Sequence, residues 1–145
     1  MPYNRPVCKI YPAVSISIND NTATVIDFDT VDYDINSEAS LTGNSITLSH
    51  DGHYMIVLAV GVTGDDSDTA LDVTLQIKAD DTTIHTERCS SGKYANLVTT
   101  HVDYFTKGTV FTAFVTADGN SSAKKINAGK AQTYLATYCL KRNKT

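Results

Sequence analysis

The residues able to do chemistry are few in this sequence, and their spacing matches no common catalytic pattern. There are four histidines among 145 residues. A metal enzyme of the cupin type would need two close histidines and a carboxylate, and His50 and His53 with Glu38 or Glu87 match that requirement poorly. The sequence holds no Gly-x-Ser-x-Gly, no HExxH and no phosphate-binding glycine loop. We therefore predict a protein that is not an enzyme, has no catalytic residues and needs no cofactor.

One acidic loop, Gly64–Thr69, carries the ligand type that a hard cation prefers. Three of its six residues are aspartates, namely Asp65, Asp66 and Asp68. Clustered carboxylates can hold calcium, but no loop of the sequence completes the EF-hand spacing, and acidic turns are commonly solvated. We predict no metal site and retain these three aspartates as weak calcium candidates.

Cysteine count and charge exclude several classes of protein. An odd number of cysteines (Cys8, Cys89 and Cys139) excludes full disulfide pairing within one chain, although a bond from Cys89 to either of the others stays open. The net charge of −4 indicates neither a nucleic-acid nor a membrane-surface partner. We interpret the Lys124-Lys125 pair as solvated. No apolar run approaches the roughly 20 residues of a membrane span, and no signal peptide is visible after Met1.

Short alternating runs separated by Gly, Asp and Asn turns predict an all-β chain in one domain. Leu71–Ile77, for example, alternates apolar and polar residues, and Ala79–Thr82 has the composition of a tight turn. Tyr94–Phe105 also fits a helical stripe, but its Val98–Val102 segment is rich in β-branched residues, so we predict a strand.

The stretch Ser45–Val62 is the centre of this pattern. Its Asp51-Gly52 pair predicts a hairpin turn between two strands. From Tyr54 to Val62 both faces are apolar, as they are in two later strands, and a small sandwich has only one interior to cover them. A second copy of the chain is the simplest cover for the other face. The predicted interface residues are Tyr54, Ile56, Leu58, Val110, Phe114, Tyr134 and Tyr138.

The first twelve residues hold all three prolines, which predicts an extended arm (1–12) ahead of the folded part (13–145). Val7, Ile10 and Tyr11 are apolar residues that a solvated tail has little reason to hold. We predict that they dock the assembly onto a larger particle. The alternative is an arm that folds back on its own or a neighbouring subunit.

Several segments resemble C1q-like domains in order and spacing. They are the Asp51-Gly52 turn with Tyr54–Val57, then Val73–Thr82, Tyr104–Val115 and Tyr134–Tyr138, and the likeness covers about Ala13 to Leu140. The sequence departs from that family in lacking tryptophan. The resemblance implies an antiparallel jelly-roll sandwich of the C1q/TNF type, a homotrimer, and a role in binding or assembly.

The sequence shows no collagen-like stalk, so the stalkless bacterial and bacteriophage versions of this family are the nearer comparison. We therefore expect a structural protein of a bacteriophage virion, either a capsid decoration (cement) protein or a fibre head, whose partner is a capsid or other virion protein. The alternative is a secreted or surface module, extracellular or on a bacterial surface, that recognises a glycan or protein receptor.

Overall fold

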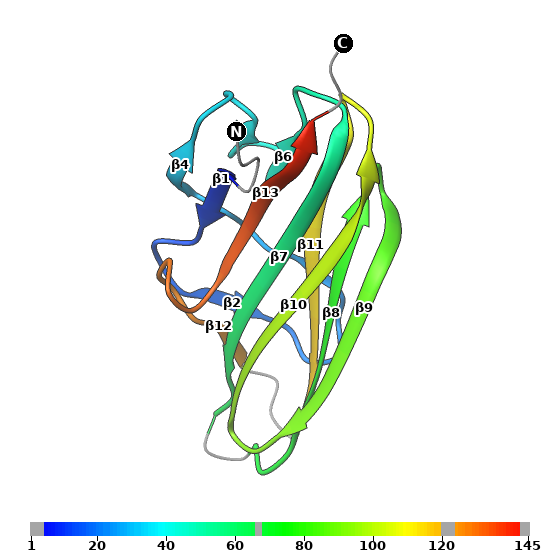
Figure 1. Ribbon diagram of the computed structural model, residues 1–145. Helices are drawn as coiled ribbons and strands as arrows, with labels where there is room; N and C mark the ends of the chain where they lie inside the picture. Colours follow the sequence, from blue (N-terminus) through cyan, green and yellow to red (C-terminus); the bar gives the residue numbers. More distant parts are fainter. Residues whose placement is uncertain (1–4, 66–67, 120–123, 143–145) are drawn as a thin grey trace.

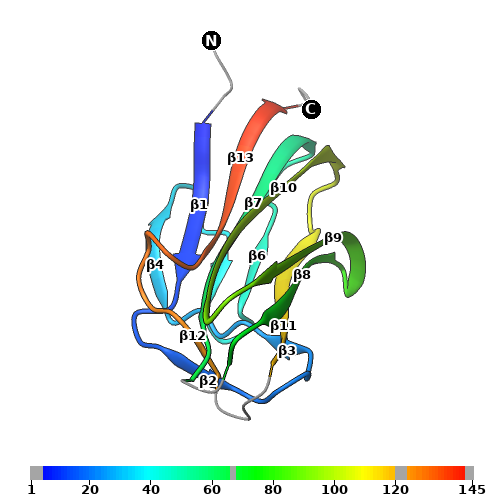
Figure 2. The ribbon, with the colours of Figure 1, turned by 90° about the horizontal axis from the view of Figure 1, so that it is seen from below.

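Two antiparallel sheets packed face to face form the fold (Figures 1 and 2). The computed structural model describes residues 5–65, 68–119 and 124–142. Sheet A contains β1 (Arg5–Tyr11), β2 (Ile16–Ile18), β4 (Thr30–Asp34), β7 (Gly52–Thr63), β10 (Tyr94–Phe105), β12 (Lys124–Ile126) and β13 (Tyr134–Arg142). Sheet B contains β3 (Thr24–Val25), β5 (Ala39–Ser40), β6 (Ser45–Thr47), β8 (Leu71–Ala79), β9 (Thr82–Ser91) and β11 (Val110–Asp118). The predicted all-β jelly-roll sandwich is confirmed.

The core lies between the sheets and follows the alternation of the strands. On β8 the residues Leu71, Val73, Leu75 and Ile77 are all buried, as their spacing predicted, and the polar residues between them are not. Phe28 and Phe111 are among the largest side chains of this core, and neither is exposed. Each such side chain stabilises the fold by about 1.5–3 kcal/mol relative to an exposed one, so packing between sheets dominates the energetics.

β7 is the central strand of sheet A and is paired along both edges. β10 pairs with it from Gly52 to Thr63, and β13 pairs with the opposite edge from Gly52 to Ala59. β12 continues that second edge at Val62 and Thr63. Since β10 pairs with β7 over its full length, the strand prediction for Tyr94–Phe105 is confirmed and the helical alternative is excluded.

The tight turn between β8 and β9 is also confirmed. Its central residues Asp80 and Asp81 have φ angles of 49° and 65°. Two successive positive φ angles suit a two-residue hairpin, because they match the twist of the paired strands.

The predicted hairpin between β6 and β7 is wrong. β6 pairs with β5 and β11 in sheet B, whereas β7 belongs to sheet A, so the connection crosses from one sheet to the other. Gly52 does not have the positive φ of a tight turn. Its lack of a side chain serves a different purpose, because a Cβ there would lie 2.4 Å from the carbonyl oxygen of Lys141 on β13.

The predicted extended arm is a strand of the sandwich over its described part. β1 pairs with β13 on one edge and with β4 on the other. Val7 is 3% exposed and Ile10 is fully buried, so neither can dock onto a particle as predicted. Tyr11 pairs with Thr30 of β4 and is half-buried. The alternative, that this segment folds back on its own subunit, describes Arg5–Tyr11 correctly.

We predict that Gly52→Ala destabilises the protein by about 1–3 kcal/mol, because the new methyl group must push apart two paired strands. Gly92→Ala is the matched control, since a Cβ at Gly92 meets nothing within 4 Å. Urea unfolding of both variants measures the difference. Equal stabilities would show that the approach of β13 to Gly52 is not constrained.

Candidate functional site

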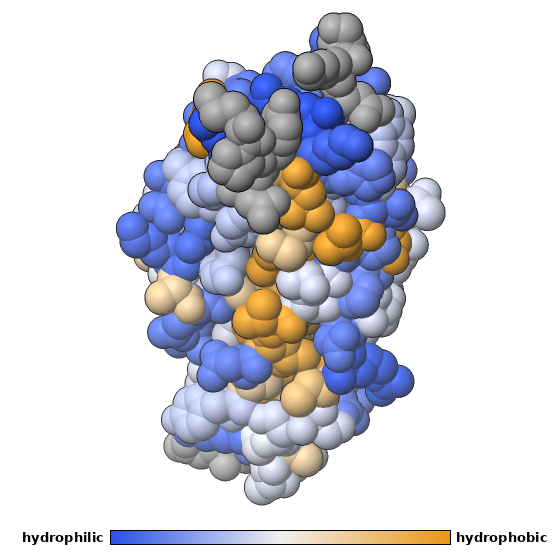
Figure 3. Space-filling view, in the orientation of Figure 1, coloured by the Kyte–Doolittle hydropathy of each residue, from blue (hydrophilic) through white to orange (hydrophobic). Residues whose placement is uncertain are grey.

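The outer side of sheet A carries an apolar surface over three neighbouring strands. The alternation that sends one set of side chains into the core sends the other set outward. We call this outward set the apolar face of sheet A. It consists of Met55, Val57 and Ala59 on β7, Val98, Val102 and Tyr104 on β10, and Tyr134, Ala136 and Tyr138 on β13. Figure 3 shows a hydrophobic band running over these strands.

The apolar face has a recessed floor beside a projecting ridge. Val57, Ala59 and Ala136 form the floor and are buried even in the single chain, although they are not part of the core between the sheets. Val98 and Val102 project from β10 and are 64% and 56% exposed. Small residues between larger ones thus give this face relief as well as apolar character.

Charged and polar groups lie toward the borders of the apolar face. The Nζ atom of Lys9 lies 4.1 Å from the centre of the Tyr134 ring, a cation–π contact. Asp32 pairs with this lysine at 3.8 Å and with Lys130 at 3.2 Å. At the other end, the His53 ring packs edge-on against Tyr104. The outward positions in between carry no Asp, Glu, Lys or Arg.

The seven predicted interface residues fall into three separate groups. Tyr54, Ile56 and Leu58 point into the core of their own chain and are at most 1% exposed, so their assignment to an interface is wrong. Sequence reasoning took the wrong alternate positions of β7, and the outward ones are Met55, Val57 and Ala59.

The other four predicted residues lie on opposite sides of the sandwich. Val110 and Phe114 are half-buried on the outer face of sheet B, where the Nζ atom of Lys78 lies 4.0 Å from the centre of the Phe114 ring. Tyr134 and Tyr138 lie on the apolar face of sheet A. One interface cannot contain all four, and only the tyrosines lie within the apolar band.

Solved structures with the same architecture identify the fold. The Eiger TNF from S. frugiperda matches with a TM-score of 0.67 and 12% identity, over 100% of this chain and 97% of that one. Murine APRIL, crystallised at pH 8.5, matches with a TM-score of 0.63 and 16% identity, over 93% of this chain and 98% of that one. This chain has a TNF-like jelly-roll fold. Identities this low establish the fold alone.

No family model and no curated protein matches the sequence of this TNF-like jelly roll. Within the described residues, no helix is long and apolar enough to cross a membrane.

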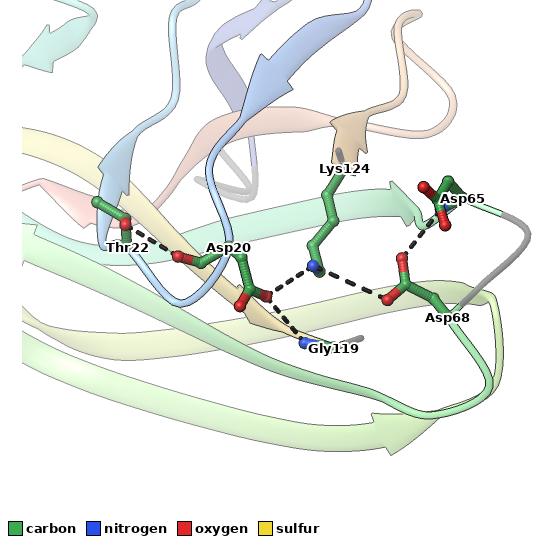
Figure 4. Close-up of polar contacts among 6 residues, drawn as sticks. All are labelled: Asp20, Thr22, Asp65, Asp68, Gly119 and Lys124. Atoms are coloured by element: carbon green, nitrogen blue, oxygen red, sulfur yellow. Dashed lines mark hydrogen bonds and ion pairs between the residues drawn. The ribbon is translucent and has the colours of Figure 1, made fainter. Parts of the chain in front are cut away.

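The acidic loop proposed for calcium faces a cation supplied by the protein itself (Figure 4). The Nζ atom of Lys124 lies 3.9 Å from Oδ1 of Asp68, and both side chains are fully buried. The same Nζ atom donates a hydrogen bond of 2.6 Å to Oδ1 of Asp20. Asp65 contributes its backbone N–H, which donates to Oδ2 of Asp68 at 2.9 Å. Asp66 lies outside the described residues.

Two glycines shape the space that Asp68 occupies. A Cβ on Gly64 would lie 2.4 Å from Oδ2 of Asp68, and a Cβ on Gly119 would lie 2.4 Å from its Oδ1. The Gly119 N–H also donates to Asp20 at 3.0 Å. These contacts hold the pKa of Asp20 below its usual value, first through the Lys124 hydrogen bond and then through that of Gly119. We call Asp20, Asp68 and Lys124 the buried lysine cluster.

The prediction that Lys124 and Lys125 are both solvated is therefore wrong for Lys124. On β12 the side chains of Lys124 and Ile126 share the buried face, and that of Lys125 is exposed. A Lys-Lys pair gives no sign of burial. The alternation with Ile126 is the one signal in the sequence that could have placed Lys124 inward.

The histidines do not assemble into a metal site in the described part of the chain, where no three His, Cys, Asp or Glu side chains are placed to hold an ion. His53 packs against Tyr104, and Glu87 lies 3.7 Å from His85. The Ser49 hydroxyl lies 2.9 Å from Nδ1 of His50 and donates to Oε2 of Glu38 at 3.2 Å. His50, His53, Glu38 and Glu87 thus form no common site.

Burial perturbs two other groups near β1. Glu38 is 3% exposed, and burial raises the pKa of its carboxyl above the usual value, although hydrogen bonds from Ser49 oppose the shift. Burial also raises the pKa of the Cys8 thiol, with a further contribution from Asp34. Cys8, Cys89 and Cys139 are all free thiols, which settles the open question of a disulfide to Cys89.

We predict that Glu38→Gln stabilises the protein near neutral pH. The folded-state pKa of Glu38 is raised, so its contribution to stability is fully present below the unfolded-state pKa of about 4.3 and is lost as the pH rises through the folded-state pKa. The glutamine cannot ionise and avoids that loss. The melting temperatures of Glu38→Gln and the wild type should diverge as the pH increases. Glu87→Gln, at an exposed position, is the control. A constant difference across the pH range would contradict this.

We predict that Lys124→Met destabilises the protein by about 3–5 kcal/mol, because it leaves the fully buried Asp68 without its counter-charge. Lys125→Met, at the exposed neighbouring position, should change stability by less than about 0.5 kcal/mol. Urea unfolding measures both variants. Similar losses would show that the buried lysine cluster does not stabilise the fold.

Proposed function

We propose that this protein is a non-enzymatic interaction module that assembles as a homotrimer through the apolar face of sheet A. The observation that carries the proposal is the relief of that face, a floor of Val57, Ala59 and Ala136 beside the projecting Val98 and Val102. Exposed valines scattered singly need no explanation, but here they border an apolar band on three adjacent strands.

A second copy of the chain is the occupant that fits this face best. The outward positions between its borders have no charged side chain, so a partner gains from apolar contact and not from ion pairing. The ridge of one copy can pack into the recessed floor of the next copy. A ridge that packs on a different surface of its neighbour makes a head-to-tail contact, which closes into a ring when the rotation permits. The C1q/TNF resemblance supports three copies.

We further propose that the trimer is a structural protein of a bacteriophage virion, as a capsid decoration protein or a fibre head. The resemblance to stalkless C1q-like domains supports this placement. Val7 and Ile10 are buried, so a contact with a capsid or other virion protein would use other surfaces. The second candidate, an extracellular module for a glycan or protein receptor, is supported by the TNF-like fold shared with the two cytokine structures.

We predict that Val98→Asp lowers the mass measured by light scattering from that of a trimer to that of a monomer, since it places a charge in an apolar contact. Val14→Asp is the matched control, because Val14 is 66% exposed and lies outside the apolar face. The circular dichroism spectrum of both variants should remain that of the wild type.

A wild-type protein that is monomeric at micromolar concentration would refute the homotrimer. A trimer that survives Val98→Asp but is lost in a variant of sheet B, such as Phe114→Asp, would place the interface on the other side of the sandwich. Co-purification with particles, or its absence, then separates the virion role from the receptor-binding one.

A further inference from the structure

The buried lysine cluster places a buried nucleophile and a buried electrophile beside a partly exposed base. Lys124 has a primary amine whose side chain is fully buried, and the side chain of Asp68 is also fully buried. Asp20 accepts a 2.6 Å hydrogen bond from the amine. From these positions we propose that Lys124 and Asp68 form an intramolecular amide (isopeptide) bond, with Asp20 as the proton relay.

Each atom of the cluster has a position suited to one step of that reaction. The Lys124 Nζ atom lies 3.9 Å from Oδ1 of Asp68, so the carboxyl carbon of Asp68 is within reach of a small side-chain movement. The N–H of Asp65 donates to the other oxygen, Oδ2, where negative charge develops when the amine attacks. The N–H of Gly119 holds Oδ1 of Asp20 against the amine.

Two glycines bring the backbone close to the electrophile. Gly64 and Gly119 approach the Asp68 carboxylate so closely that a Cβ on either would overlap its oxygens. An amine and a carboxyl group held in this way react with an effective concentration that reaches about 10⁵ M or more in well-oriented pairs. This proximity, with burial that excludes bulk water, offsets the tendency of a carboxylate and an ammonium group to remain as ions.

The reaction balances without any added reagent. Asp20 takes one proton from the Lys124 ammonium group and passes it to Oδ1 of Asp68. The neutral amine then attacks the carboxyl carbon, a C–N bond forms, and the electron pair of the carbonyl moves onto Oδ2. A second proton follows the same route from the nitrogen to Oδ1. The electron pair on Oδ2 then re-forms the carbonyl, the C–Oδ1 bond breaks, and one water leaves. Asp20 ends as the carboxylate it was at the start.

The ion pair is the resting state of the cluster, because the lowered pKa of Asp20 keeps that carboxyl ionised beside Lys124. Each molecule can form the bond only once, and a proton must first leave the ion pair. The yield should therefore increase with the time that the folded protein is kept.

The test is the intact mass of the reduced, folded, full-length protein after prolonged incubation. We expect a mass below that of the sequence by one water. Lys124→Arg keeps the positive charge but has no primary amine, so it should retain the full mass. Lys125→Arg, the neighbouring control, should lose the water as the wild type does. Asp20→Asn should retain most of the full mass, since its amide cannot relay the proton.

Peptide mapping decides which atoms are joined. A branched peptide that links Asp68 to Lys124 supports the proposal, and it does so on the wild type even if a variant fails to fold. Full sequence mass in the aged wild type would overturn it. A branch to Asp20 would overturn the assigned roles, and a water lost from a linear peptide, as in an aspartyl succinimide, would show that no cross-link had formed.

Discussion

β7 is paired along both edges and packed against the core on one face, and the rest of the fold follows from that constraint. Hydrogen bonds hold it along both edges, and its inward side chains fill the core. Only its outer face is left without a second layer. Because that face is lined by Met55, Val57 and Ala59, the strand is apolar on both sides for two separate reasons: one face stabilises the single chain, and the other suits contact between chains. In the proposed trimer, stability and assembly would thus depend on the same strand.

The sequence predicted the strands well and their partners poorly. Alternation in Leu71–Ile77 and the β-branched Val98–Val102 segment follow from local chemistry, and the structure confirms both. The β6–β7 hairpin failed because Asp51-Gly52 has the composition of a turn, whereas the absence of a Cβ at Gly52 is required by Lys141, far along the chain. Periodicity shows that a strand such as β7 has two apolar faces, but it does not show which face points inward.

The same limit explains the errors at the arm and in the acidic loop. Proline-rich 1–12 predicts an extended chain, and Arg5–Tyr11 is indeed extended, but a strand within a sheet and a free arm have similar local signatures. The aspartates of the loop were retained only as weak calcium candidates, and a lysine of the same chain lies beside Asp68. That lysine, Lys124, comes from β12, far along the chain from Asp20 and Asp68, so only the three-dimensional structure brings the charges together.

The pairing of β1 with β13 has a consequence for how the protein is made. Arg5–Tyr11 emerges from the ribosome long before its partner Tyr134–Arg142. Until then Val7 and Ile10 lack the strand that completes their cover, and the edge of β1 is open to pairing with other nascent chains.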